Sequence, residues 1–228
     1  MMEFLFLDLD DTILDFHKAE RIALSKTLES FGVAPDDEVL ARYHVINLQH
    51  WERLETGELT RDQVQEGRFR VLFQELGRTV DPVAVTRTYE RNLGIGHYFL
   101  PGAEEAVQSL HKKYRLFLAS NGTASVQHSR LTSAGLYPYF EKVFVSQNIG
   151  YNKPARDYFE ACFRQIPDFC PERAIMVGDS LTSDILGGIN AGIRTCWVNP
   201  AHAPARANIQ LDYEIENLSQ LEEVLKTL

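Results

Sequence analysis

Cysteine is scarce in this chain, with only Cys162, Cys170 and Cys196 among its 228 residues. Their number is odd, and no two of them form a CxxC pair. These absences disfavour both a disulfide framework and a cysteine zinc site, and they fit a protein kept in a reducing compartment.

Long apolar runs and basic clusters are also missing. No apolar stretch approaches the roughly 20 residues of a membrane-spanning helix, and no basic segment precedes Asp8. We therefore expect no membrane anchor and no signal peptide, and we expect a cytoplasmic location. The formal net charge is −9, and the densest basic run is only "HKK" at 111–113. A nucleic acid polymer would be repelled by this charge, so we expect none as a partner.

What the chain does contain is enough apolar sequence for a core, since 44% of its residues are hydrophobic. The first expected strand covers residues 3–8, and a long helical region follows at about 17–96. Thr60 and Gln63 form a capping box for a helix at 61–76, and Asp81 before Pro82 reads as the start of another. The remaining helices of this region are expected at 17–32 and 36–56.

After "FLPG" at 99–102, short apolar strands alternate with amphipathic helices. The strands are expected at 114–120, 142–146, 174–179, 194–199 and 213–217. The helices between them are expected at about 103–113, 123–135, 155–166 and 182–191. Such alternation predicts an α/β fold whose parallel sheet, joined by strand 3–8, is covered by helices on both faces.

Polar residues follow the expected strands at the end where parallel sheets bind ligands. They are Asp8 and Asp10, Ser120 and Asn121, Lys153, and Asp179 with Asp184. Because carboxylates gathered at one edge would repel each other, a divalent cation is expected among them. Oxygen ligands without His or Cys favour Mg²⁺, which commonly joins carboxylates to a substrate phosphate. His44, His50 and His97 show no spacing typical of metal ligands.

The same residues suit phosphoryl transfer from a small-molecule phosphate ester. Asp8 can act as a nucleophile that forms an aspartyl-phosphate. Asp10 can move the proton, and in a regular strand residues i and i+2 share a face. Lys153 adds positive charge, while Ser120 and nearby backbone N–H groups can donate hydrogen bonds to phosphate.

Four segments resemble the motifs of the haloacid dehalogenase-like superfamily. They are "DLDDT" at 8–12, "SNGT" at 120–123, Lys153 in "NKP", and "GDSLTSD" at 178–184. The resemblance implies a Rossmann-like parallel-sheet core at 1–14 and 99–228 with an α-helical cap inserted at 15–98.

The resemblance also implies a role for each matching residue. Asp8 would be the nucleophile and Asp10 the general acid and base. Ser120, Asn121 and Lys153 would bind the phosphoryl group. Mg²⁺ would be held by Asp8, Asp179 and the backbone carbonyl of Asp10, with Asp184 and Thr12 as supporting residues.

Asp10 favours a phosphatase, because the dehalogenases that resemble this chain lack an aspartate two residues after the nucleophile. A narrower resemblance joins "FLFLDLDDTILDF" and "VGDSLTSDILGGINAGIRTCWVNP" to the pyrimidine 5′-nucleotidase subgroup. It implies dUMP, dTMP, UMP or a noncanonical analogue as the substrate.

Other functions stay open at this point. A phosphatase for a sugar phosphate or phosphoglycolate would use the same motifs, and so would a phosphotransferase or mutase with a second acceptor. A phospho-accepting signalling module resembling response-regulator receivers is disfavoured, because receivers are about half this length and carry the phosphorylated Asp on a later strand.

Several residues have ordinary structural explanations. Asp11 is expected to face solvent or to order the turn, and the Thr12 hydroxyl to brace the loop. Gly187 and Gly188 are expected to allow close helix packing. Tyr43, Trp51 and Phe69 could stack on a base, but such residues more often fill the core of a helical bundle.

Overall fold

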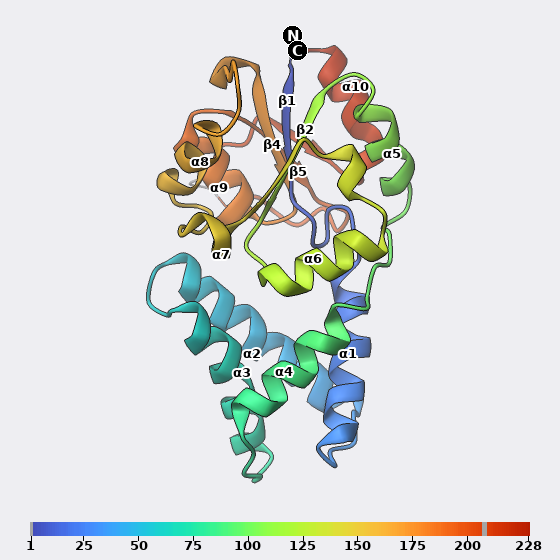
Figure 1. Ribbon diagram of the computed structural model, residues 1–228, viewed down its shortest axis with the longest axis vertical. Helices are drawn as coiled ribbons and strands as arrows, with labels where there is room; N and C mark the ends of the chain where they lie inside the picture. Colours follow the sequence, from blue (N-terminus) through green and yellow to red (C-terminus); the bar gives the residue numbers. More distant parts are fainter. Residues whose placement is uncertain (1, 207–208) are drawn as a thin grey trace. The chain divides into compact units, whose positions relative to one another are not determined.

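A computed structural model describes residues 2–206 and 209–228 of the chain. Two compact units make up the molecule (Figure 1). The larger comprises Met1–Phe16 and His97–Leu228, and the smaller comprises His17–Gly96. Among the described residues, no helix has the length and apolar character needed to cross a membrane.

The larger unit is built on a six-stranded sheet in the order β3-β2-β1-β4-β5-β6, and every neighbouring pair is parallel. The strands are β1 (Phe4–Leu7), β2 (Arg115–Ser120), β3 (Lys142–Val145), β4 (Ala174–Gly178), β5 (Arg194–Val198) and β6 (Tyr213–Ile215). This confirms the predicted parallel α/β sheet. The strand order changes direction at β1, which lies between β2 and β4, and ligands bind beside such switch points.

The strands are apolar throughout because both faces of the sheet are covered. All four residues of β1 are buried. Phe4 and Phe6 join an aromatic cluster with Phe159 of α8 (Arg156–Phe163), whereas Leu5 and Leu7 join an aliphatic cluster on the opposite face. Figure 1 shows α8 and α9 (Leu186–Ala191) on one side of the sheet, and α5 (Ala103–Leu110) and α10 (Leu221–Lys226) on the other.

The helices of the larger unit lie between the strands and after the last one. They are α5 (Ala103–Leu110), α6 (Ala124–Ser133), α7 (Ser146–Ile149), α8 (Arg156–Phe163), α9 (Leu186–Ala191) and α10 (Leu221–Lys226). Short 3₁₀ turns cover Tyr137–Tyr139, Pro171–Arg173 and Leu218–Gln220, and a π-helical turn at Leu181–Ile185 leads into α9. α7, α10 and the π-helical turn were not predicted from the sequence pattern.

The glycines of α9 pack as expected. A Cβ on Gly188 would lie 2.7 Å from Cγ2 of Thr195, and one on Gly187 would lie 2.7 Å from the Phe159 ring. Both distances are too short for any side chain, so these glycines let α9 approach β5 and α8 closely.

The smaller unit is helical. Its helices are α1 (Phe16–Ser30, in this unit from His17 onwards), α2 (Asp37–Glu55), α3 (Arg61–Glu75) and α4 (Pro82–Leu93). The predicted capping box is confirmed, since Thr60 Oγ1 accepts the Gln63 N–H and the Gln63 side chain accepts the Thr60 N–H. Asp81 caps α4 by accepting the Val83 N–H at 3.0 Å.

An aromatic cluster forms the centre of this helical unit. Tyr43, Phe69 and Tyr89 have no exposed surface, and their ring centroids lie 5.2 to 5.7 Å apart. The core role expected of Tyr43 and Phe69 is therefore confirmed. Trp51 is only partly buried, and its Nε1 donates a hydrogen bond to Asn47 Oδ1 at 3.1 Å.

Candidate active site

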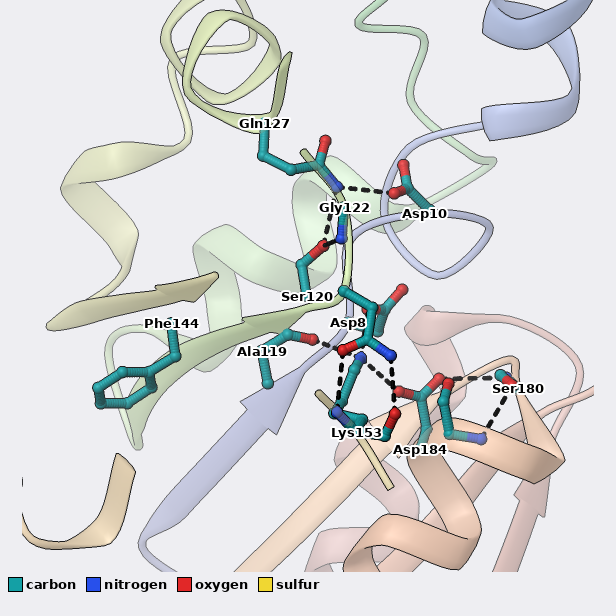
Figure 2. A network of polar contacts seen from close by, with 12 residues as sticks. Asp8, Asp10, Ala119, Ser120, Gly122, Gln127, Phe144, Lys153, Ser180 and Asp184 are labelled. Carbon is teal, nitrogen blue, oxygen red and sulfur yellow. Dashed lines mark hydrogen bonds and ion pairs between the residues drawn. The ribbon is translucent and has the colours of Figure 1, made fainter. Parts of the chain in front are cut away.

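The polar residues singled out in the sequence meet at the carboxyl ends of the central strands (Figure 2). Asp8 directly follows β1, Ser120 is the last residue of β2, and Asp179 directly follows β4. The loop after α7 supplies Lys153, and the π-helical turn supplies Asp184. Four segments far apart in the sequence thus converge beside the switch point of the sheet.

The turn after β1 is ordered by its own side chains. Asp11 has a φ of 52°, its N–H bonds to Leu14 O at 2.8 Å, and its Oδ1 accepts the Phe16 N–H at 2.8 Å. Asp11 therefore orders the turn and caps the start of α1, as expected. The bracing bond expected of Thr12 is absent, because its buried Oγ1 has no hydrogen-bond partner among the described residues.

Lys153 is almost completely buried, and all three of its ammonium N–H groups are used. Nζ donates to Asp8 Oδ1 at 2.7 Å, to Asp184 Oδ1 at 2.6 Å and to the Ala119 carbonyl at 2.6 Å. An ammonium group has only three donors. Lys153 therefore holds Asp8 and Asp184 in place here, and its contact with a phosphoryl group stays a prediction.

The carboxylates outnumber the positive charge at this point. Burial raises the pKa of Asp8 to about 8, with Asp184 and Asp10 adding to the rise and Lys153 opposing it. Burial also raises the pKa of Asp179 well above its usual value, together with the charges of Asp184 and Asp8. For Lys153, burial disfavours the ammonium, but the two carboxylates that it contacts outweigh burial and raise its pKa.

This imbalance fits a divalent cation. One carboxylate oxygen from each of Asp8, Asp179 and Asp184 lies within 4.8 Å of the others. Three carboxylates beside one ammonium group leave a formal excess of two negative charges, which a divalent cation would balance. The donors are all oxygen atoms, the ligand type that Mg²⁺ prefers. The part expected of the Asp10 carbonyl stays a prediction.

Asn121 fastens the loop that carries Lys153. Its Nδ2 donates to the Lys153 carbonyl at 2.9 Å, and its Oδ1 accepts the Lys153 N–H at 2.9 Å. Both ends of the amide thus hold the backbone of the lysine. The phosphate contact predicted for Asn121 stays a prediction, whereas this fastening role was not foreseen.

Asp10 contacts two residues that the sequence reasoning missed. Gln127 Nε2 donates to Asp10 Oδ2 at 2.7 Å, and Arg130 forms an ion pair with Asp10 Oδ1. Figure 2 shows the Asp10 carboxylate directed towards Gln127 rather than towards Lys153. Both partners are buried on α6 and lie one helical turn apart. Their spacing beside buried Val126 and Leu131 was the available signal, since polar side chains seldom occupy an inward face without a partner.

A second cluster lies within the helical unit. His17, Glu20 and His44 each bring a ligand atom within 4.8 Å of the others. The spacing of His44 in the sequence does not indicate this cluster, because it joins residues of two different helices. His44 Nδ1 lies 2.9 Å from Glu20 Oε2, and Asn47 Nδ2 donates to Glu20 Oε1 at 2.7 Å. These hydrogen bonds account for the burial of the Glu20 carboxylate.

Residues 2–192 match the family of haloacid dehalogenase-like hydrolases. The chain belongs to this family. Its fold agrees with the crystal structure of HAD-hydrolase YfnB from Bacillus subtilis bound to magnesium, with a TM-score of 0.94, 38% identity and 98% of each chain covered.

Two relatives are named as nucleotidases. The chain is 38% identical to pyrimidine 5′-nucleotidase PynA of Streptococcus pneumoniae, covering 96% of this chain and 93% of PynA. It is 29% identical to pyrimidine 5′-nucleotidase YjjG of Escherichia coli, covering 98% of this chain and 97% of YjjG. The family match and these relatives together support an enzyme of the phosphoric monoester hydrolase class.

Proposed function

We propose that this protein is a Mg²⁺-dependent 5′-nucleotidase that hydrolyses pyrimidine nucleoside monophosphates through an aspartyl-phosphate on Asp8. The observation that carries the mechanism is the group formed by buried Asp8, Lys153 and Asp184 with partly buried Asp179, and its excess of negative charge. The likeness to PynA and YjjG over nearly the whole chain supports dUMP, dTMP, UMP or a noncanonical analogue as the substrate.

A hydrogen bond from Lys153 orients the Asp8 carboxylate for attack on phosphorus. Lys153 binds its Oδ1 at 2.7 Å, which leaves Oδ2 to form the bond to phosphorus. In the first step that bond forms, and the bond between phosphorus and the ester oxygen breaks with its electron pair on the leaving oxygen. Burial raises the pKa of Asp8, and Lys153 opposes that rise and so favours the ionised form that attack requires.

Asp8, Asp179 and the carbonyl of Asp10 would hold Mg²⁺, supported by Asp184. When bound, Mg²⁺ supplies positive charge that offsets the carboxylates and the phosphoryl oxygens. Ser120 sits at the end of β2 and donates its hydroxyl hydrogen to a phosphoryl oxygen.

Asp10 moves one proton in each half of the reaction. Its carboxyl group gives a proton to the leaving oxygen, and the resulting carboxylate takes a proton from water in the second step. That water attacks phosphorus, the bond to Asp8 breaks, and inorganic phosphate leaves. Each Asp10 oxygen keeps a second lone pair beside its bond to Gln127 or Arg130, so proton transfer does not require either contact to break.

Two further assignments complete the proposal. We assign the helical unit the role of the cap expected at 15–98, which would select the substrate and exclude bulk water. We also propose a cytoplasmic location, which the scarcity of cysteine supports.

Release of inorganic phosphate tests the proposal. Purified protein is assayed with Mg²⁺ and with EDTA against UMP, dUMP, dTMP, purine nucleotides, sugar phosphates and phosphoglycolate. We expect Mg²⁺-dependent release chiefly from the pyrimidine nucleotides, and none from them with Asp8→Asn. Release chiefly from a sugar phosphate or phosphoglycolate would keep the mechanism and overturn the substrate. No release from any ester would overturn the proposed function.

A further inference from the structure

We propose that Gln127 is a positioning residue that orients both Ser120 and Asp10 for phosphoryl transfer. This inference rests on the proposed function and extends it to a side chain outside the four motifs. Gln127 lies on α6, is 1% exposed, and bridges the two residues (Figure 2). Its Nε2 donates to Asp10 Oδ2 at 2.7 Å and to Ser120 Oγ at 2.8 Å.

The orientation of the Gln127 amide follows from its neighbours. A carboxylate only accepts hydrogen bonds, so the amide group that faces Asp10 must be the NH₂ group. The amide oxygen then faces Arg130, whose NH1 donates to Gln127 Oε1 at 3.2 Å. Because the Arg130 side chain can only donate, the group that faces it must be the amide oxygen. The contacts at both ends of the Gln127 amide therefore require the same orientation.

This orientation decides what Ser120 can do. Ser120 Oγ accepts the Gly122 N–H at 3.0 Å and one hydrogen from Gln127 Nε2. A hydroxyl oxygen has two lone pairs, and these two donors use both. The hydroxyl hydrogen of Ser120 must therefore point to a third group that accepts. A phosphoryl oxygen beside Asp8 is such an acceptor, so Gln127 makes Ser120 an obligate donor.

The second hydrogen of Nε2 holds Asp10. Arg130 is fully buried and pairs with Asp10 Oδ1, while Gln127 binds Oδ2. The Asp10 carboxylate is thus fixed at both oxygens by residues of one helix. Because Nε2 has two hydrogens and two acceptors, the phosphate-binding hydroxyl and the proton-transfer group are tied to a single nitrogen.

Packing around Gly122, in the segment "SNGT" at 120–123, supports the same role for Gln127. A Cβ on Gly122 would lie 2.4 Å from Gln127 Nε2, and no real side chain tolerates that distance. Gly122 therefore leaves the space that the amide occupies. Gly122→Ala is expected to displace Gln127 and to reproduce the effect of replacing it.

The test uses the full-length protein with Gln127→Met, which keeps the length of the side chain and removes its hydrogen bonds. The first readout is the Kd of inorganic phosphate in the presence of Mg²⁺. We expect Gln127→Met to raise this Kd about tenfold, because Ser120 loses its fixed orientation. In a Ser120→Ala background the same change should have little further effect, since the two act as one unit.

The second readout separates the Asp10 contact from the Ser120 contact. Single-turnover cleavage is compared for UMP, whose alkoxide needs a proton on leaving, and for p-nitrophenyl phosphate, whose phenolate does not. Gln127→Met should slow cleavage of UMP about tenfold more than cleavage of p-nitrophenyl phosphate. Gln127→Glu should be more damaging than Gln127→Met, because its carboxylate would repel Asp10.

Gln108→Met is the matched control, since partly buried Gln108 of α5, which lies outside the site, also donates to a carboxylate, that of Glu104. It should match wild type in both readouts. The inference is overturned if Gln127→Met leaves both readouts unchanged, if its effects on phosphate binding simply add to those of Ser120→Ala, or if both esters slow equally. Wild-type protein that cleaves no ester overturns the proposed function instead, while the phosphate-binding cycle still tests the link to Ser120.

Discussion

Gly178 and Asp184 lie so close together that a Cβ on Gly178 would stand 2.2 Å from Asp184 Oδ2. The glycine ends β4, and the aspartate lies in the turn that follows. Oδ2 accepts the Ser180 N–H at 3.1 Å, while Oδ1 accepts a hydrogen bond from Lys153. The glycine thus creates the space in which Asp184 reaches the buried lysine.

Gly178→Ala should therefore displace Asp184 from Lys153. Overpacking of this kind lowers the free energy of unfolding by about 1–3 kcal/mol, and we expect the affinity for Mg²⁺ to fall as well. Chemical denaturation and calorimetric titration with Mg²⁺ measure the two effects. Gly188→Ala is the control, because its Cβ would meet Thr195 and Met176 in the packing of α9. It should lower stability and leave Mg²⁺ affinity unchanged; equal losses of affinity would refute the link to Asp184.

Lys153→Met removes the ammonium that Asp8 and Asp184 share. Breaking a buried ion pair from one side costs about 3–5 kcal/mol, because the other charge stays buried. Urea denaturation at about pH 7 should show this loss. Lys142→Met, at an exposed position, serves as the control and should change stability little.

The loss of unfolding free energy caused by Lys153→Met should become smaller as the pH falls. Without Lys153 the folded protein binds protons on buried carboxyl groups that the unfolded chain releases, so its stability decreases as pH rises from about 4 towards neutral. Denaturation of Lys153→Met in acidic buffer should therefore reveal a smaller difference from wild type. A difference that stays constant with pH would contradict the role of the lysine as the counter-charge.

Protons and Mg²⁺ should compete for Asp8. Burial raises the pKa of Asp8 to about 8 in the metal-free protein, so at neutral pH the carboxyl is largely protonated and a cation must displace the proton. The Kd for Mg²⁺ should fall as pH rises through this range. Calorimetry in buffers of different ionisation enthalpy should detect proton release on binding. Binding with no proton release at neutral pH would contradict this prediction.

Asn121→Asp should loosen the loop that carries Lys153. The substituted carboxylate can still accept the Lys153 N–H but cannot donate to the Lys153 carbonyl, and it would face that oxygen instead. We expect about 1–3 kcal/mol of lost stability, with faster hydrogen exchange at the backbone amides of residues 151–153. Unchanged exchange in that loop would show that the amide does not hold it.

The strands of the sheet could be predicted closely, because an apolar run bounded by turn residues is visible within a short stretch of sequence. All six strands were expected within a residue or two, since apolar runs bounded by turns leave few alternatives for a parallel sheet. The convergence of Asp8, Ser120 and Asp179 followed from the same rule, because parallel strands end at one edge. α10 was missed because Leu221–Lys226 is too short for a periodic pattern to stand out.

The contacts of the site could not be predicted in the same way. Gln127 and Arg130 meet Asp10 only because α6 packs with one particular face towards the turn after β1, and that rotation is set by tertiary packing. The gathering of His17, Glu20 and His44 likewise depends on how α1 lies against α2. Sequence spacing within one helix carries no such information about its neighbours.

The most direct test of the account is to find where phosphate becomes attached during turnover. Protein mixed with Mg²⁺ and UMP labelled in its phosphate is quenched in acid within one turnover, digested, and analysed by mass spectrometry. The account predicts an acyl phosphate on Asp8, within the peptide that contains residues 4–16, and no label on Asp8→Asn. Label on another residue, or phosphate release without any labelled protein, would contradict it.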